Sequence, residues 1–151
     1  MAKRILVALD RTTESESAIP FIIDAARGGG ATVRLLHVAP IPDAIIGSDE
    51  RVAASIYEET ARLEAQGMDY LATVAARFEG IPVETVVRFG NPVTMILDDA
   101  EIFGADLIAL TTRKRNLVSA VFPNRVADRV SRRTDTPVFV MRVGRPGCLS
   151  L

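Results

Sequence analysis

Apolar residues follow two patterns along this chain: short continuous runs, and longer stretches in which they recur with helical spacing. The continuous runs predict buried strands, because a parallel strand covered on both faces is apolar at nearly every position. They cover residues 3–10, 32–39, 83–89, 106–112 and 137–143. The helical spacing predicts helices over residues 18–26, 51–79, 93–103 and 126–133. This alternation predicts an α/β fold with an open, mostly parallel five-stranded sheet and helices on both faces.

A few residues mark where the helices begin. The pattern Thr13-x-x-Glu16 is typical of a capping box and predicts the start of the first helix. Pro20 lies inside that helix pattern and has no backbone donor, so the helix is expected to be kinked or to start late. Asn91 and Pro92 supply an N-cap and a proline at the first position of the third helix.

Length and composition place the chain among globular domains. It has 151 residues, of which 48% are hydrophobic and 25% charged, and its formal net charge is -1. This length predicts a single domain over residues 1–151 with a substantial core. No apolar run approaches the roughly 20 residues that cross a bilayer, and no signal-peptide pattern follows Met1, so we expect a cytoplasmic protein without a membrane partner. Cys148 is the only cysteine and cannot form an internal disulfide.

Ligands of such sheets bind beyond the carboxyl ends of the strands, where the strand order reverses. This rule points to residues 10–13, 38–42 and 111–125. The candidate cleft residues are Asp10, Thr12, Val38, Thr111, Thr112, Lys114, Asn124 and Arg125. An aspartate in the place of Asp10 can hold a ribose, a metal ion or a lysine, or it can cap the following helix. The loop over residues 40–49 is a candidate lid or specificity segment.

The pattern offers little for catalysis. His37 is the only histidine and lies within an apolar strand, which favours a packed, hydrogen-bonded residue over a general base. Tyr70 and Phe78 follow the apolar stripe of the longest helix and are interpreted as core residues. The chain has no phosphate-binding P-loop and no Gly-x-Gly-x-x-Gly fingerprint, and a phosphorylated receiver domain would need an acidic pair where only Asp10 stands. We expect a protein that is not an enzyme and has no metal site.

Five fragments occur in order between residues 3 and 143. They are Lys-Arg-Ile-Leu-Val-Ala-Leu-Asp at 3–10, Leu-Leu-His-Val at 35–38, Gly-Asn-Pro at 90–92, Gly-Ala-Asp-Leu-Ile-Ala-Leu at 104–110 and Asp-Thr-Pro-Val-Phe-Val-Met-Arg at 135–142. In these fragments and their spacing the chain resembles the universal stress protein family. The resemblance implies a Rossmann-like sheet with strand order 3-2-1-4-5, a homodimer paired through the fifth strand, and a cytoplasmic role in stress survival.

Many members of that family bind ATP through a glycine-rich loop after the fourth strand that ends in Gly-Ser or Gly-Thr. The corresponding positions here are Thr111, Lys114, Asn124 and Arg125, so every signature position is substituted. Glycines let the backbone approach phosphates closely, whereas side chains at these positions occupy that space. By this resemblance the chain is similar to the branch that does not bind ATP. Asp10 and Val38, by contrast, stand where nucleotide-binding members have equivalents.

Positive charge is concentrated near the C-terminus. Nine of the eighteen Lys and Arg residues lie between positions 113 and 145, against only Asp128 and Asp135. Arg125, Arg129, Arg132 and Arg133 recur at near-helical spacing, which is typical of one solvated helix face. A second interpretation is an anion site formed by Arg113, Lys114, Arg115 and Arg125. Nucleic acid is an unlikely partner, because Phe122 is the only aromatic residue among these charges.

These observations support one leading hypothesis and one alternative. The first is a dimeric binding or regulatory module without ordinary ATP binding and with no cofactor, which acts through a protein partner or a small anionic ligand. Its dimer would pair strand 137–143 across a two-fold axis. The alternative is a protein that binds ATP or another adenylate through Lys114 and Arg125 in place of glycine backbone contacts.

Overall fold

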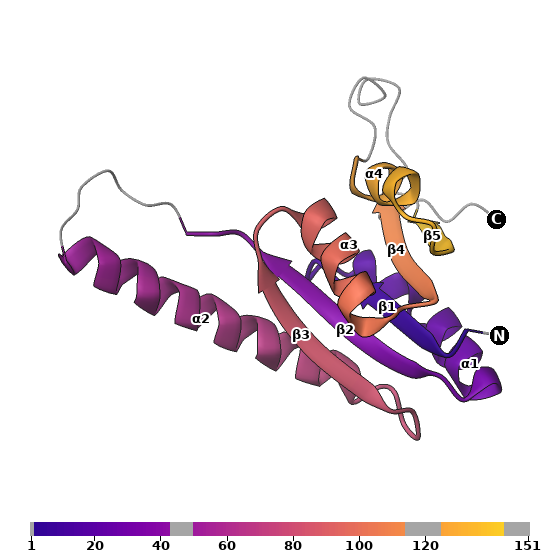
Figure 1. The fold of residues 1–151 in the computed structure, drawn as a ribbon. Helices are drawn as coiled ribbons and strands as arrows, with labels where there is room; N and C mark the ends of the chain where they lie inside the picture. The colour runs from indigo at the N-terminus through magenta and orange to yellow at the C-terminus, as the bar shows by residue number, and fades with distance from the viewer. Residues whose placement is uncertain (1, 43–49, 114–124, 144–151) are drawn as a thin grey trace.

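The computed structural model describes residues 2–42, 50–113 and 125–143, and it contains the expected parallel five-stranded sheet (Figure 1). The strands are β1 (Arg4–Ala8), β2 (Thr32–Ala39), β3 (Val83–Phe89), β4 (Leu107–Arg113) and β5 (Val138–Val143). Their order is β3-β2-β1-β4-β5, which confirms the predicted fold class and strand order. Val7 at the centre of β1 is in register with Leu35 of β2 and Ala109 of β4. No helix in the described ranges is long and apolar enough to cross a membrane.

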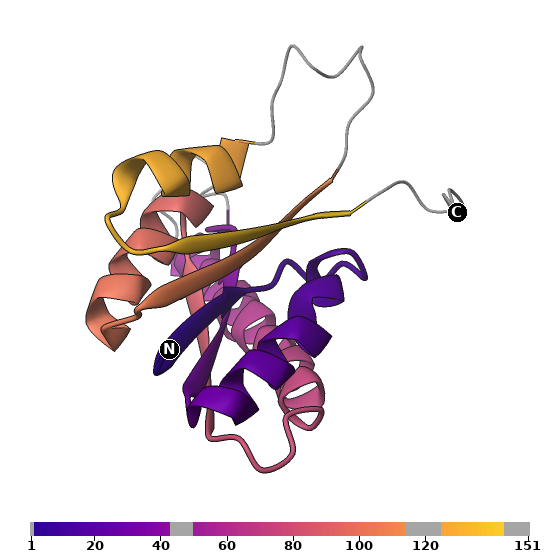
Figure 2. The ribbon, with the colours of Figure 1, turned by 90° about the vertical axis from the view of Figure 1, so that its right-hand side faces the viewer.

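Helices cover both faces of the sheet (Figure 2). The elements are a short 3-10 helix η1 (Ser15–Ala18), then α1 (Ile19–Gly29), α2 (Glu50–Ala75), α3 (Pro92–Phe103) and α4 (Arg125–Arg133). Side chains alternate along a strand, so Ile5 and Val7 of β1 pack under α1 and α2 whereas Leu6 packs under α3 and α4. Both sides of β1 are therefore buried, which explains why its sequence is a continuous apolar run.

The start of the first helix differs from the prediction. Helix α1 begins at Ile19, so the late start rather than the kink is what Pro20 imposes, and Pro20 stands in the first turn where a missing N–H costs little. The capping box over Thr13 and Glu16 is wrong: residue 18 is the N-cap and makes no side-chain cap. Glu16 lies instead in η1, and its carboxylate bonds to Tyr70 and Arg77 of α2.

Helix α2 is the longest, as expected, but it ends at Ala75 rather than at residue 79. The last turn tightens, because the N–H of Phe78 donates to the carbonyl of Ala75 at 3.0 Å. This turn places the Phe78 ring in the core beside Leu71 and Val74, as the prediction of a core residue requires. The strand boundaries agree with the prediction to within two residues at each end.

Helix α3 begins where its signals place it and is clamped to the sheet by a buried charge. The side chain of Asn91 accepts a hydrogen bond from the N–H of Thr94 at 3.2 Å, as predicted for an N-cap. Asp99 is fully buried and pairs with Arg88 of β3 at 3.0 Å and with Arg34 of β2 at 3.4 Å. Removing a partner from a buried ion pair leaves an uncompensated charge, so these pairs hold α3 in one position on the sheet.

Candidate functional site

A cleft lies at the carboxyl ends of β1, β2 and β4, at the point where the strand order reverses. After β1 the chain passes to the face covered by α1, and after β4 it passes to the face covered by α4, so the two connections diverge and leave space between them. The cleft has a volume of about 260 Å³. It is lined by Ala8, Leu9, Asp10, Ser15, Leu36, Val38, Pro92, Ile96, Leu110, Thr111 and Val126.

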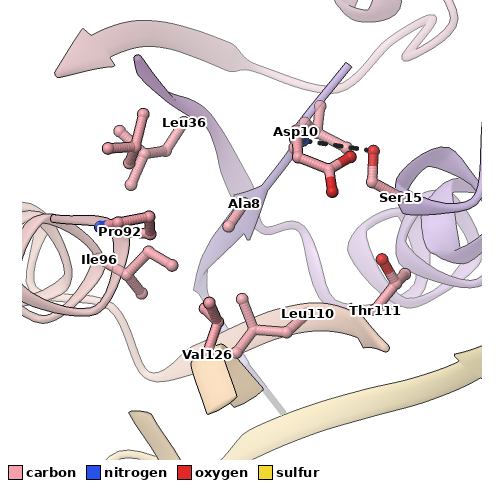
Figure 3. Close-up of a pocket in the computed structure, with 11 residues that line it drawn as sticks. Ala8, Asp10, Ser15, Leu36, Pro92, Ile96, Leu110, Thr111 and Val126 are labelled. Carbon is pink, nitrogen blue, oxygen red and sulfur yellow. Dashed lines mark hydrogen bonds between the residues drawn. The ribbon is translucent and has the colours of Figure 1, made fainter. Parts of the chain in front are cut away.

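The cleft has an apolar side and a polar side (Figure 3). Leu36 of β2 with Pro92 and Ile96 of α3 forms the apolar wall, and Ala8 lies between the two sides. The polar side is made by the carboxylate of Asp10 and the hydroxyl-bearing residues Ser15 and Thr111. Such an arrangement suits a ligand with a flat or apolar part at one end and hydrogen-bonding groups at the other.

The loop over residues 10–15 is closed by its own hydrogen bonds. The N–H of Thr12, at 3.0 Å, and its hydroxyl both donate to Oδ1 of Asp10. The Thr12 hydroxyl oxygen in turn accepts from the N–H of Ser15 at 3.1 Å. Ser15 Oγ donates to the carbonyl of Thr12 at 2.9 Å and accepts from the N–H of Asp10 at 3.3 Å. Asp10 therefore organises the loop after β1 rather than capping α1.

The charge state of Asp10 follows from these bonds. Burial by itself would raise the pKa of the Asp10 carboxyl, but hydrogen bonds from Thr12 and Ser15 outweigh burial and lower it below 3.8. Asp10 is thus an ionised acceptor at neutral pH. Arg11 beside it has a φ of 68°, the only positive value of a residue other than glycine in the described ranges. Such a conformation costs about 1–3 kcal/mol and persists only where the surroundings impose it.

The structure brings together part of the predicted cleft. Asp10, Val38 and Thr111 line it, while Thr12 supports Asp10 from within the loop. Thr112 follows Thr111 on β4 and is absent from the lining. Lys114 and Asn124 lie outside the described residues, as does most of the candidate lid, and Arg125 is described only as the first residue of α4.

Sequence reasoning did not select most of the apolar lining. The residues it left out are Ala8, Leu9, Ser15, Leu36, Pro92, Ile96, Leu110 and Val126. Their sequence signal is that of core residues or helix starts, because the cleft is a gap in the same apolar layer that forms the core. Ser15 alone carried a usable signal, since it follows a strand-ending aspartate in a polar loop.

His37 is a packed residue, as predicted, and does not line the cleft. It is buried, and its Nδ1 lies 2.9 Å from the carbonyl oxygen of Leu9. A carbonyl oxygen can only accept, so Nδ1 carries the proton. Within the described residues no three His, Cys, Asp or Glu side chains gather in a way that could hold a metal ion.

The basic C-terminal region is described only in α4 and β5. Arg129, Arg132 and Arg133 are exposed on α4, and Arg132 lies 3.9 Å from Asp128 one turn earlier. This agrees with one solvated helix face. The alternative anion site of Arg113, Lys114, Arg115 and Arg125 falls outside the side chains that the structure describes.

Comparison with known proteins identifies relatives of this chain. The model of the Universal stress protein family matches residues 1–142. A putative universal stress protein of Staphylococcus haemolyticus is 28% identical over 141 residues, which are 93% of this chain and 84% of that protein. The universal stress protein YxiE of Bacillus subtilis is 25% identical over 148 residues, 94% of this chain and 100% of that protein.

Solved structures share the fold. The structure of the hypothetical protein MJ0577 matches with a TM-score of 0.80 at 20% identity, over 95% of this chain and 98% of that one. A universal stress protein in complex with cAMP matches with a TM-score of 0.63 at 18% identity, over 93% and 96%. A family member from Arabidopsis thaliana with AMP bound matches with a TM-score of 0.59 at 14% identity, over 93% and 90%.

Proposed function

Because this chain belongs to the universal stress protein family, we propose that it is a binding module rather than an enzyme, with a cleft that takes the nucleoside part of an adenylate and binds ATP only weakly. The observation that carries the proposal is the two-sided cleft, whose volume is about 260 Å³. Ligand pockets commonly have about 300–1,000 Å³, so this cleft suits a base and a sugar better than a whole nucleoside triphosphate. The cAMP and AMP bound by two proteins of the same fold support adenylates as the ligand class.

Asp10 and the apolar wall divide the work of recognition. A purine ring is flat and apolar on its faces, which suits the surface formed by Leu36, Pro92 and Ile96. A ribose presents hydroxyl donors, which suit the ionised carboxylate of Asp10 and the hydroxyl of Thr111. The base would therefore lie toward α3 and the sugar toward the loop after β1.

Weak ATP binding follows from the substituted loop. A glycine in place of Thr111 would let the chain approach a phosphate, but Thr111 brings a Cβ and a hydroxyl into the cleft wall. Hydrogen bonds from backbone amides to a charged acceptor are worth about 1.5–3 kcal/mol each, so losing two of them outweighs a typical single gain. Flexible cations at Lys114 and Arg125 replace a fixed cradle only in part.

The chemistry of the cleft favours binding over catalysis. Among the residues described as lining it, Asp10 alone titrates, and its lowered pKa makes it an acceptor rather than a proton donor near neutral pH. General acid–base catalysis needs a group whose pKa lies near the working pH.

Calorimetry with adenosine, AMP and magnesium ATP tests the proposal. We expect adenosine and AMP to bind and ATP to bind at least tenfold more weakly than AMP. The variant Thr111→Gly, Lys114→Gly, Asn124→Gly and Arg125→Ser, made together, should raise ATP affinity. Ala8→Leu should abolish binding of all three because it fills the middle of the cleft, whereas Ala72→Leu, on an exposed position of α2, should change nothing. Tight ATP binding by the natural protein, or no binding of adenosine and AMP, contradicts the proposal.

A further inference from the structure

The loop that carries Asp10 and Ser15 is fixed at both ends by contacts that converge on one side chain of α2, Tyr70. Tyr70 is not among the residues that line the cleft. It is half-buried and packs against the core cluster formed by β1, β2, α1 and α2.

The first fixed point is the end of β1. The carbonyl of Leu9 accepts the Nδ1–H of His37, and the ring of Tyr70 meets the His37 ring edge-on, with centroids 6.3 Å apart and planes at 67°. Helix α2 reaches this depth because Gly67 lies one turn before Tyr70: a Cβ at Gly67 would stand 3.2 Å from Cδ2 of His37. The ring of Tyr70 therefore supports the imidazole that holds Leu9.

The second fixed point is Glu16 in η1. Tyr70 donates its hydroxyl to Glu16 Oε2 at 3.0 Å, and Arg77, two turns further along α2, donates to Oε1 at 3.2 Å. Burial, and then Glu16, raise the pKa of Tyr70 to about 12, so its hydroxyl stays protonated and donating throughout the physiological range. Glu16 is thereby tied to α2 rather than left in solvent.

Between these two points the loop is strained. Arg11 adopts a left-handed φ of 68°, and residues 10–15 spend their polar groups on one another. A loop that contains an unfavourable backbone conformation relaxes unless its flanks are held. His37 and Glu16 hold those flanks, and Tyr70 contacts both.

We propose that Tyr70 is a positioning residue for the cleft: through its ring on His37 and its hydroxyl on Glu16, it holds the loop over residues 10–15 in the geometry that presents Asp10 and Ser15 to a ligand. The proposal rests on the proposed function only for its effect on affinity, because the effect on the loop exists without ligand. It couples the occupancy of the cleft to the contact between η1 and α2.

Amide hydrogen exchange of the free protein tests the loop directly. Tyr70→Phe keeps the ring and removes only the bond to Glu16, and we expect the amides of Thr12, Ser15 and Glu16 to exchange about three- to tenfold faster. Glu16→Ala should have the same effect, and Glu16→Gln, which keeps an acceptor for the hydroxyl, should restore most of the protection. Combining Tyr70→Phe with Glu16→Ala should add little to either change alone, because both break one contact.

Two controls separate positioning from general stabilisation. Tyr57→Phe removes a hydroxyl from the same helix at a side chain that is 78% exposed, and should change nothing. Val74→Ala weakens the core under α2 without touching Glu16, so it should lower global stability but leave the exchange of Thr12 and Ser15 unchanged. Unchanged loop exchange in Tyr70→Phe, or equal acceleration in Val74→Ala, overturns the proposal.

Calorimetry with AMP provides the second readout. Tyr70→Phe should weaken AMP binding about three- to tenfold, in parallel with the exchange of the loop. A faster-exchanging loop with unchanged AMP affinity would refute a role in positioning the ligand. If the natural protein does not bind AMP at all, the proposed function fails, while the exchange experiment still decides whether Tyr70 holds the loop.

Discussion

At the scale of single residues, the hydroxyl of Thr12 has two functions in the cleft loop. It donates to the carboxylate of Asp10 and accepts from the N–H of Ser15. The first bond keeps Asp10 ionised and oriented, and the second fixes the start of η1. A sequence pattern that suggests helix capping is here used to close a loop, because Asp10 and Ser15 compete for the same short-range bonds.

We therefore predict that Thr12→Val raises the pKa of Asp10 toward its ordinary value of 3.8. A carboxyl whose pKa is lowered on folding stabilises the fold above that value, and this stabilisation is lost as the pH falls through the folded-state pKa. The variant should thus lose stability relative to the natural protein at pH 6, and the difference should shrink toward pH 2. NMR titration of Asp10 and urea unfolding at both pH values provide the measurement. Thr12→Ser, which keeps the hydroxyl, should titrate like the natural protein.

At the scale of secondary-structure elements, the packing of α2 on β2 and β3 depends on one glycine. Gly67 is buried in the middle of a helix, where glycine costs about 1 kcal/mol relative to alanine. The structure explains this cost: a Cβ at Gly67 would lie 2.9 Å from Cγ2 of Val87 and 3.2 Å from Cδ2 of His37. The close approach of α2 also brings Tyr70 to His37, so the element packing and the cleft loop share one cause.

Gly67→Ala should destabilise the protein despite the better helix propensity of alanine. The gain of about 1 kcal/mol is outweighed by an overpacking cost of about 1–3 kcal/mol. We expect a net loss of about 1 kcal/mol in urea unfolding, and less when Val87→Ala opens space in the same chain. Gln66→Ala, an exposed change in the same turn, should alter stability by less than about 0.5 kcal/mol. A stabilised Gly67→Ala protein would show that α2 can move away from β3 at no cost.

At the scale of the whole molecule, β5 presents an open edge of the sheet. Among the described strands it pairs only with β4, and it exposes Phe139 by 38% and Val140 by 37% on its two faces. Unpaired strand edges with apolar side chains associate unless they are covered. We propose that this edge is covered by β5 of a second copy across a two-fold axis, which would give the homodimer expected from the sequence.

Phe139→Asp or Val140→Asp should then convert a dimer into a monomer at micromolar concentration, as measured by sedimentation. A charge at this edge has to be desolvated when the strands pair, which costs more than a typical interface gains from one side chain. Ile102→Asp, at a residue that is 67% exposed on α3, should leave the dimer intact. A natural protein that sediments as a monomer, or a dimer that survives both changes at β5, excludes this interface.

Agreement between sequence and structure depends on whether local residues decide the outcome. The strand 83–89 and the N-cap Asn91 were predicted correctly, because continuous apolar runs and an Asn-Pro pair act locally. Thr13 and Glu16 misled, because Glu16 is recruited by Tyr70, which lies 54 residues away in the chain. The end of α2 was placed four residues too late, because the core position of Phe78 tightens the last turn.

The sequence by itself determined the α/β fold, the order of its elements and the family, since burial on both faces of a parallel sheet imposes a pattern that can be read position by position. It also identified the polar side of the cleft at Asp10 and Thr111, because strand ends are visible in that pattern. Only the tertiary structure decided the apolar wall at Leu36 and Ile96 and the support of the loop by Tyr70. Those residues share the apolar or amphipathic character of ordinary core positions, and only the packing of separate elements determines which of them face a cavity and which hold its walls.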